Sequence, residues 1–226
     1  QAELLAEGGF GVVCIDTRGH GDSDAPPPPY AMADLVADTV AVLDALRITR
    51  AHLIGLSLGG MSALGLAIAH PQRLLSLLVC DARADMPGTM GVVWNERIAS
   101  ARQHGCAALA DATCERWFGP AFVAAHPDIA QGVKERVAGT SVDGFVGCAQ
   151  AIQGLDWIAG LGRITAPTTL LVGANDGPLP AAMQALQSLI PGARFELIAD
   201  AGHLPHIDQT AAFNAALLRH LAPFAR

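Results

Sequence analysis

What most constrains this chain is the sequence GLSLGG at residues 55–60, because it predicts a strand, a tight turn and a helix in immediate succession. The pattern is G-x-S-x-G. An apolar run at 51–54 precedes it, and a run rich in small residues at 59–69 follows. Such a turn has room only for small residues beside the serine, which accounts for Gly55 and Gly59. It holds Ser57 Oγ at the edge of a sheet, where a helix N-terminus stabilises a developing anion. Ser57 is therefore the predicted nucleophile.

The other apolar runs predict a mostly parallel sheet with helices between its strands. Strand-like runs, typical of strands buried on both faces, lie at 10–16, 51–54, 74–80, 168–172 and 194–198. Helical patterns lie at 1–7, 33–46, 59–69, 180–189 and 211–221. Alternating strands and helices are connected by right-handed crossovers, so the predicted fold class is α/β with helices flanking the sheet.

Between the third and fourth strand-like runs, the character of the sequence changes. From about residue 85 to 160 it shows helical patterns without buried strands, and all three tryptophans fall there. We interpret this region as a helical cap inserted into the sheet domain. The predicted division is residues 1–83 for the first part of the core, 84–160 for the cap insertion and 161–226 for the second part of the core.

The composition excludes several classes of protein. With 51% hydrophobic and 15% charged residues among 226, a disordered chain is excluded, and the length suits one domain with an insertion. A net charge of −7 is unfavourable for nucleic acid as the main partner. No apolar run approaches the roughly 20 residues of a membrane helix, and the first residues lack the basic region of a signal peptide. The five cysteines form no C-x-x-C pair and are expected to be small buried residues in a reducing compartment, so we predict a cytoplasmic protein.

A general base and an acid are expected after Ser57, and the chain offers both. His203 follows the strand-like run 194–198, and it is interpreted as the base that takes the proton of Ser57. Asp176 follows the run 168–172, in a glycine-containing loop, and it is the favoured acid. Asp81, directly after the run 74–80, is a second candidate for the acid, and Asp200 is a third.

Four further interpretations concern the site and its surroundings. The backbone N–H of Leu58 is the predicted oxyanion donor, and a second donor is expected from a His-Gly loop upstream of Gln1. Because the chain starts inside a predicted helix and without Met, we expect residues to precede Gln1 in the whole protein. His206 forms an H-x-x-H pair with His203, but its spacing does not favour a metal site. The glycine-rich stretch 16–24 lacks the third glycine of a phosphate loop, so we interpret it as a structural loop that helps to frame the site.

Four segments together resemble the α/β-hydrolase superfamily over the whole length of the chain. They are DTRGHGDS at 16–23, GLSLGG at 55–60, GAND at 173–176 and AGHLP at 201–205. Within it, the chain is most similar to the 3-oxoadipate enol-lactonase group. The segments LVCDAR at 78–83, ERWF at 115–118 and CAQAI at 148–152 carry that similarity. The chain departs from the family at its front, since the first strands of the fold and the oxyanion-loop motif are missing from this sequence.

The resemblance implies an enzyme of aromatic compound catabolism, in the β-ketoadipate pathway, that opens an enol-lactone with water. Ser57, His203 and Asp176 would then act as a catalytic triad, with no metal and no organic cofactor. The substrate of that group carries a carboxylate, so a basic residue facing the pocket is expected. Arg116 beside Trp117 is the favoured pair for substrate binding. The remaining cap residues weighed for such roles are Arg97, Arg102, Lys134, Arg136, Trp94 and Trp157.

Other functions remain open at this point. The same residues suit a broader carboxylesterase or lactonase, including one for acyl-homoserine lactones, or a hydrolase of carbon–carbon bonds. A binding module on an inactive hydrolase fold is the non-enzyme alternative. A haloalkane dehalogenase is disfavoured, because that chemistry needs a carboxylate nucleophile where Ser57 stands. The expected partner is a small-molecule ester or lactone, neither nucleic acid nor a membrane is expected as a partner, and the oligomeric state is left open.

Overall fold

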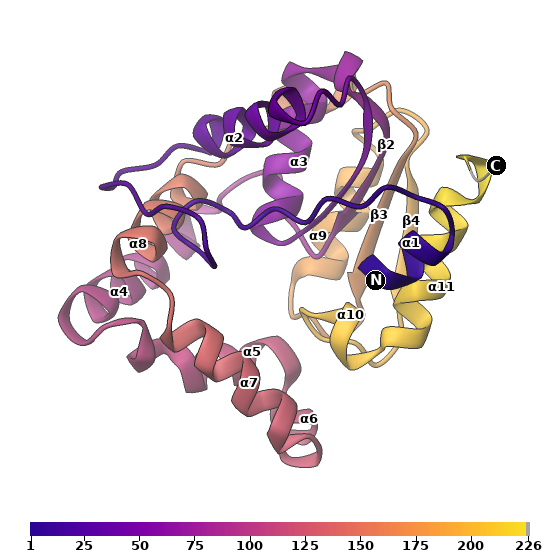
Figure 1. Ribbon diagram of the computed structural model, residues 1–226. Coiled ribbons are helices and arrows are strands. Elements are labelled where there is room, and N and C mark those ends of the chain that lie inside the picture. Colours follow the sequence, from indigo (N-terminus) through magenta and orange to yellow (C-terminus); the bar gives the residue numbers. More distant parts are fainter. Residues whose placement is uncertain (225–226) are drawn as a thin grey trace.

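The computed structural model describes residues 1–224, and its centre is a four-stranded parallel sheet (Figure 1). The strands are β1 (Ala51–Leu56), β2 (Leu74–Cys80), β3 (Thr168–Gly173) and β4 (Arg194–Ile198), in the spatial order β1-β2-β3-β4. The parallel register pairs Gly55 with Val79 and Val79 with Leu170, so the carboxyl ends of the strands meet at one edge. The predicted α/β class with a parallel sheet is confirmed.

The two central strands, β2 and β3, are buried on both faces, as their apolar runs predict, whereas the edge strands β1 and β4 are only partly buried. In β2, Leu77 and Val79 belong to the core on one face, and Leu78 and Cys80 belong to the core on the other. Side chains alternate between the faces of a strand, so a strand covered on both faces needs apolar residues at every position. Helices complete each core.

The first core lies against α2 (Met32–Ala45), α3 (Leu58–Ala69) and α9 (Leu179–Gln187). The second core lies against α1 (Ala2–Glu7) and α11 (Thr210–Leu221), and the short α10 (Pro205–Asp208) precedes α11. Figure 1 shows these helices on opposite sides of the sheet. None of the helices in residues 1–224 combines the length and the apolar character needed to span a membrane.

Between β2 and β3 the described chain is helical and has no strand of its own. It comprises α4 (Gly88–His104), α5 (Ala110–Phe118), α6 (Pro120–Ala125), α7 (Pro127–Ala138) and α8 (Val142–Gln153). Short 3₁₀ helices at Pro71–Arg73, Cys106–Leu109, Ile158–Arg163 and Ala222–Phe224 complete the described elements. Figure 1 shows α4 to α7 extending away from the sheet. The boundaries at residues 84 and 160 stay predictions.

The predicted strand at residues 10–16 is wrong. These residues are extended but form no strand, and Val13 and Ile15 are 47% and 41% exposed. A cavity of about 380 Å³ lies between this segment and the edge strand β1, lined by residues of both. The backbone of the segment therefore reaches no neighbouring strand, and an apolar run without such a neighbour is not buried. For the same reason Cys14 is exposed, against the expectation of a buried thiol, whereas the other four cysteines are buried.

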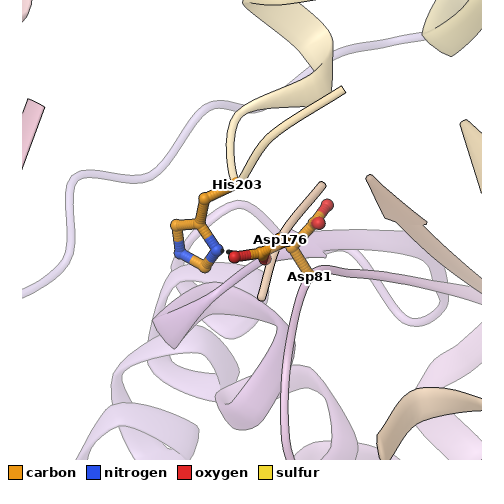
Figure 2. A group of neighbouring side chains, drawn as sticks. All are labelled: Asp81, Asp176 and His203. Atoms are coloured by element: carbon orange, nitrogen blue, oxygen red, sulfur yellow. Dashed lines mark hydrogen bonds and ion pairs between the residues drawn. The ribbon is translucent and has the colours of Figure 1, made fainter. Parts of the chain in front are cut away.

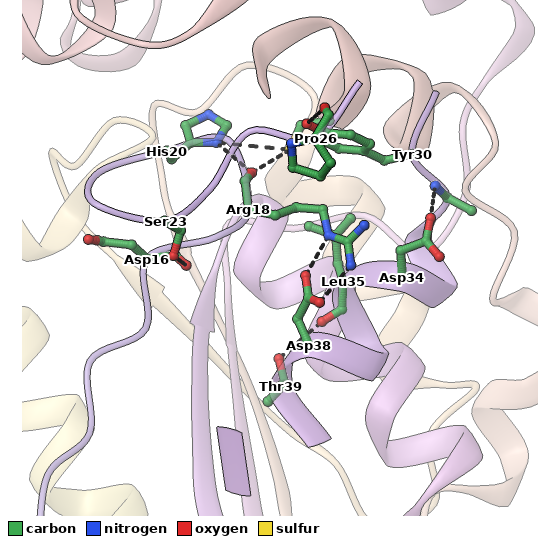
Figure 3. A network of polar contacts seen from close by, with 12 residues as sticks. Asp16, Arg18, His20, Ser23, Pro26, Tyr30, Asp34, Leu35, Asp38 and Thr39 are labelled. Carbon is green, nitrogen blue, oxygen red and sulfur yellow. Dashed lines mark hydrogen bonds and ion pairs between the residues drawn. The ribbon is translucent and has the colours of Figure 1, made fainter. Parts of the chain in front are cut away.

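The glycine-rich loop that follows is held by local contacts (Figure 3). Arg18 donates two hydrogen bonds of 2.6 Å to the carboxylate of Asp38 on α2. Gly19 has a positive φ of 78°, and a Cβ there would lie 2.2 Å from Gly144 Cα at the start of α8. The loop thus connects α2 with the helical region by close packing, which agrees with its interpretation as a structural loop.

Candidate active site

The turn at Ser57 has the geometry that its glycines predict, with one difference. Ser57 has a φ of 51°, a conformation that few non-glycine residues adopt, and it is the residue before the first turn of α3. A Cβ on Gly55 would lie 2.3 Å from Gly59 O, and one on Gly60 would lie 2.7 Å from Ala82 Cβ. At Gly59, in contrast, a Cβ meets nothing within 4 Å. Gly55 and Gly60, rather than Gly55 and Gly59, are therefore the two glycines that close packing requires.

The start of α3 also leaves backbone donors free beside the serine. Leu58 is the first residue of α3, a position whose N–H has no partner within the helix. The Ser57 side chain makes no capping hydrogen bond to that helix. Its hydroxyl is therefore available to another group, while the N–H of Leu58 is available to an anion near Ser57 Oγ.

The structure brings Ser57, His203 and Asp176 together, although they lie far apart in the sequence. His203 Nε2 is 2.9 Å from Ser57 Oγ, and His203 Nδ1 is 2.6 Å from Asp176 Oδ2. Figure 2 shows the second of these contacts. A carboxylate oxygen only accepts, so Nδ1–H donates to Asp176 and Nε2 accepts from the Ser57 hydroxyl. The His203 and Asp176 side chains are each 12% exposed, so the pair is largely shielded from water.

Two hydrogen bonds from backbone N–H groups hold the loop that carries His203. The N–H of His203 donates to Trp117 O at 2.7 Å, and the N–H of Gly202 donates to Asp208 Oδ2 at 2.6 Å. A Cβ on Gly202 would lie 2.2 Å from Trp117 O, so this close approach requires glycine. The end of α5 thus positions the predicted base, and no signal in the sequence pointed to Asp208 as a support of this loop.

Asp81, the second candidate for the acid, lies beside Asp176 rather than replacing it (Figure 2). Its side chain is fully buried, and Oδ1 accepts from the N–H of Gly173 at 2.9 Å. Desolvation raises the pKa of Asp81 to about 9, and the nearby carboxylates of Asp176 and Asp208 act in the same direction. Asp200, the third candidate, is an exposed turn residue with a φ of 59°.

Within residues 1–224, one group of side chains has the composition of a metal site. The nearest oxygen and nitrogen atoms of Asp81, Asp176 and His203 lie within 4.8 Å of one another. His203 and Asp176 are already hydrogen-bonded to each other there. His206 is not a member of this group; burial lowers the pKa of His206 to about 4, and its ring packs edge-on against Phe213.

Trp117 and Arg116, the residues predicted to bind substrate, lie at the end of α5 close to His203. The Trp117 ring stacks on the His203 ring, with centroids 6.1 Å apart and an angle of 26° between the planes. The Arg116 guanidinium lies 6.0 Å from the centre of the Trp117 ring. Arg116 is exposed to solvent, although neighbouring residues partly desolvate its guanidinium. Desolvation and the charge of Arg97 lower the pKa of Arg116 to about 10. It is still a cation at neutral pH.

The other cap residues divide between core and surface. The indole N–H of Trp157 donates to Met61 O at 3.0 Å, and the ring packs against Gly65, so this tryptophan belongs to the core. Trp94 is half-buried beneath the Arg97 guanidinium. Lys134 forms an ion pair of 2.7 Å with Asp111, and Arg102 and Arg136 are exposed. Among these cations, Arg97 is the one brought near Arg116.

Comparison with known proteins gives a consistent picture. Residues 2–216 match the sequence model of a family described as the alpha/beta hydrolase family. The 3-oxoadipate enol-lactonase 2 of Acinetobacter baylyi is 33% identical over 207 residues, which cover 91% of this chain and 76% of that protein. A candidate carbamate hydrolase of Variovorax paradoxus is 32% identical over 230 residues, covering 98% of this chain and 85% of that protein.

A solved structure is similar at the level of the fold as well. The crystal structure of the enol-lactonase from Burkholderia xenovorans LB400 superimposes with a TM-score of 0.87 at 32% sequence identity. The superposition covers 92% of this chain and 79% of that one. The arrangement of β1 to β4 with their flanking helices is therefore shared with a protein of known structure.

Proposed function

The chain belongs to the alpha/beta hydrolase family, and from that premise we propose that it is a serine hydrolase that opens an enol-lactone ring. The substrate we propose is 3-oxoadipate enol-lactone, because the similar proteins of Acinetobacter baylyi and Burkholderia xenovorans are named enol-lactonases. The observation that supports catalysis is the hydrogen-bond chain from Ser57 through His203 to Asp176, at 2.9 and 2.6 Å. The proposed base is thus within hydrogen-bond reach of both the proposed nucleophile and the proposed orienting acid.

In the proposed acylation step, Ser57 Oγ attacks the lactone carbonyl carbon while its proton moves to His203 Nε2. The ring carbon–oxygen bond then breaks, and the leaving enol oxygen takes the proton back from Nε2. The acyl carbon is now bonded to Ser57 Oγ as an acyl-enzyme. The leaving oxygen stays in the site, because it belongs to the same carbon chain. Asp176 stabilises the imidazolium that exists between the two proton transfers.

In the proposed deacylation step, His203 Nε2 takes a proton from water, which attacks the acyl carbon. The bond to Ser57 Oγ breaks, and the proton returns to that oxygen, releasing a carboxylic acid. The N–H of Leu58, at the start of α3 next to Ser57, is the proposed donor to the carbonyl oxygen as negative charge develops there in both steps. The N-terminus of α3 adds its partial positive charge there.

Arg116 is the proposed contact for the carboxylate of the substrate. Arg116 lies beside Trp117, whose ring stacks on His203. We therefore expect a small molecule bound at Ser57 to extend as far as the Arg116 guanidinium. Arg116 makes no ion pair with an acidic side chain in the described part of the chain. A cation of this kind favours an anionic substrate.

The test is the hydrolysis of 3-oxoadipate enol-lactone followed by ultraviolet absorbance, with Ser57→Ala as the control variant. We expect turnover by the wild type and a loss of about a thousandfold or more in the variant. A fluorophosphonate, which labels activated serines, provides the second readout. Labelling of Ser57 without lactone turnover would disprove the substrate, and turnover that survives Ser57→Ala would disprove the nucleophile.

The comparisons leave a second enzyme function to be tested in the same assay. The candidate carbamate hydrolase of Variovorax paradoxus is as similar to this chain as the enol-lactonases are. Carbamates, simple nitrophenyl esters and acyl-homoserine lactones are therefore the competing substrates, and the ranking of their kcat/KM values decides between them. A hydrolase-fold binding module would neither label with the fluorophosphonate nor turn over any of these substrates.

We also propose the cytoplasm as the compartment of this enzyme. All five cysteines are free thiols, and four of them are buried as small apolar residues. This use of cysteine is typical of a reducing compartment.

A further inference from the structure

Asp81 is a buried acid that forms no ion pair within residues 1–224. It follows β2 directly, and its side chain has no measurable exposure to solvent. The backbone N–H of Gly173 satisfies Oδ1, whereas Oδ2 is buried and has no donor from which to accept a hydrogen bond. An unsatisfied oxygen in such a place is costly if the group is an ionised carboxylate.

The groups around Asp81 make ionisation more unfavourable still. Asp176, after β3, and Asp208, on α10, add negative charge, and the neighbouring Cys80 is a buried thiol whose pKa is raised by desolvation. A ring nitrogen of His203 lies within 4.8 Å, but the Nδ1–H of His203 is already donated to Asp176. Two carboxyl groups so close in a dry site share one proton rather than ionising together.

The proton belongs on Asp81 rather than on Asp176. Asp176 accepts the His203 N–H at 2.6 Å, which favours its ionised form. Asp81 Oδ2 has no such donor within residues 1–224, so a proton on that oxygen converts an unsatisfied acceptor into a donor, and Asp176 is the neighbouring acceptor. The raised pKa of Asp81 agrees with this assignment.

We propose that Asp81 is a neutral carboxylic acid whose Oδ2–H donates a hydrogen bond to the Asp176 carboxylate and so positions Asp176 for His203. Asp81 is then a positioning residue that extends the hydrogen-bond chain from Ser57 by one member; Figure 2 shows Asp81 next to Asp176 and His203. Its catalytic consequence rests on the proposed function, whereas the hydrogen bond itself is a property of the resting protein.

The backbone conformation at Asp81 determines which substitutions can test the proposal. Its φ is 46°, a conformation that glycine and asparagine tolerate far better than other residues. Asp81→Asn keeps an acceptor for Gly173 and supplies a neutral N–H donor toward Asp176. Asp81→Gly fits the same backbone but removes both. Asparagine keeps the volume and the hydrogen bonds of the side chain, whereas glycine removes both hydrogen bonds, leaves a space in the buried site and relieves the backbone strain.

The first measurement is the pKa of His203 by nuclear magnetic resonance, in the wild type and in Asp81→Asn. If Asp81 is neutral, the variant exchanges one neutral group for another. The pKa values of His203 in the wild type and in Asp81→Asn should then agree within about 0.3 unit. If Asp81 is ionised, the variant removes a negative charge within 4.8 Å of the imidazole, and the pKa should fall by about one unit or more. A fall of that size would overturn the proposal.

The second measurement follows the His203 Nδ1–H resonance and the rate of fluorophosphonate labelling of Ser57. We expect Asp81→Asn to keep the resonance and a labelling rate within about threefold of the wild type. We expect Asp81→Gly to shift the resonance and to slow labelling by about tenfold, a typical effect of one lost positioning hydrogen bond. If both variants lower the thermal stability but leave resonance and labelling rate unchanged, Asp81 is only structural and the proposal fails.

Two controls keep the result independent of the substrate. If Asp81→Gly does not fold, the His203 pKa in Asp81→Asn decides the protonation state of Asp81 by itself. If the wild type labels with the fluorophosphonate but does not hydrolyse the enol-lactone, the proposed substrate is wrong, while both measurements on Asp81 still apply.

Discussion

At the scale of single residues, close packing and an unusual backbone angle decide the shape of the turn at Ser57. The positive φ of Ser57 costs on the order of 1–3 kcal/mol, and the surrounding contacts have to hold it. Gly55 and Gly60 allow the backbone of α3 to approach the ends of β1 and β2. The motif is thus a steric requirement of the fold as well as the location of the proposed nucleophile.

The pair Gly55→Ala and Gly59→Ala tests this requirement. The Cβ of the first variant would lie 2.3 Å from Gly59 O, so we expect a loss of stability of about 1–3 kcal/mol and slower fluorophosphonate labelling. The second variant meets open space within α3, and we expect a change of about 0.5 kcal/mol or less, or a small gain. Urea denaturation measures both, and an equal loss in the two variants would contradict the steric explanation.

Arg116 carries a prediction about substrate charge. We expect Arg116→Ala to raise KM for the anionic enol-lactone by about tenfold, with little change in kcat, because one charge-assisted contact is lost. For a neutral nitrophenyl ester, KM should stay the same. Lys134→Ala is the matched control, since Lys134 is paired with Asp111 on the surface of the helical region. Equal effects on the anionic and the neutral substrate would exclude Arg116 as the carboxylate contact.

At the scale of elements, two apolar runs of similar composition take different conformations. Residues 74–80 form β2, which has a paired strand on each side and a helix layer on each face. Residues 10–16 are equally strand-like in sequence, but they lie across a cavity from β1 and stay exposed. The difference comes from neighbours and not from propensity, because strand formation needs a partner backbone.

Amide hydrogen exchange distinguishes the two segments directly. No backbone acceptor is found for the N–H groups of residues 11–15 within residues 1–224, whereas β2 is hydrogen-bonded on both sides. We expect exchange in residues 11–15 to be at least about a hundredfold faster than at Leu77 and Val79. Equal protection of both segments would show that residues 10–16 are paired in solution.

At the scale of the whole molecule, a buried polar network ties three strands to the last long helix. His220 on α11 contacts Thr169 Oγ1 and Ser76 Oγ at 2.9 Å each, and His52 on β1 contacts the same Ser76 oxygen at 2.7 Å. Desolvation, followed by the nearby charges of His52 and Arg194, lowers the pKa of His220 to about 4. The network is therefore built around a neutral imidazole.

This network predicts acid sensitivity. Unfolded His220 has a pKa near 6.5, above its folded value, so the unfolded chain binds the proton first as the pH falls. The stability contributed by the neutral ring is present above pH 6.5 and is lost between pH 6.5 and about 4, by about 3 kcal/mol. His220→Gln lacks this titration, so the stability difference between wild type and variant should shrink by that amount on acidification. A constant difference in urea denaturation across this range would refute the assignment.

The sequence by itself determined the parallel sheet with its four strands and the helices between them, because the periodicity of apolar residues indicates local burial. It also named Ser57, Asp176 and His203, because their positions after strand-like runs place them at one edge of a parallel sheet. The structure brings these three within hydrogen-bond reach, and their catalytic role remains our proposal.

Only the tertiary structure decided that Asp81 lies beside Asp176, that Trp117 stacks on His203, and that residues 10–16 have no partner strand among residues 1–224. The physical reason is the same in each case. Proximity between residues from distant parts of the chain, and the presence or absence of a neighbour, are set by how elements pack against one another. Local sequence patterns carry no record of that packing.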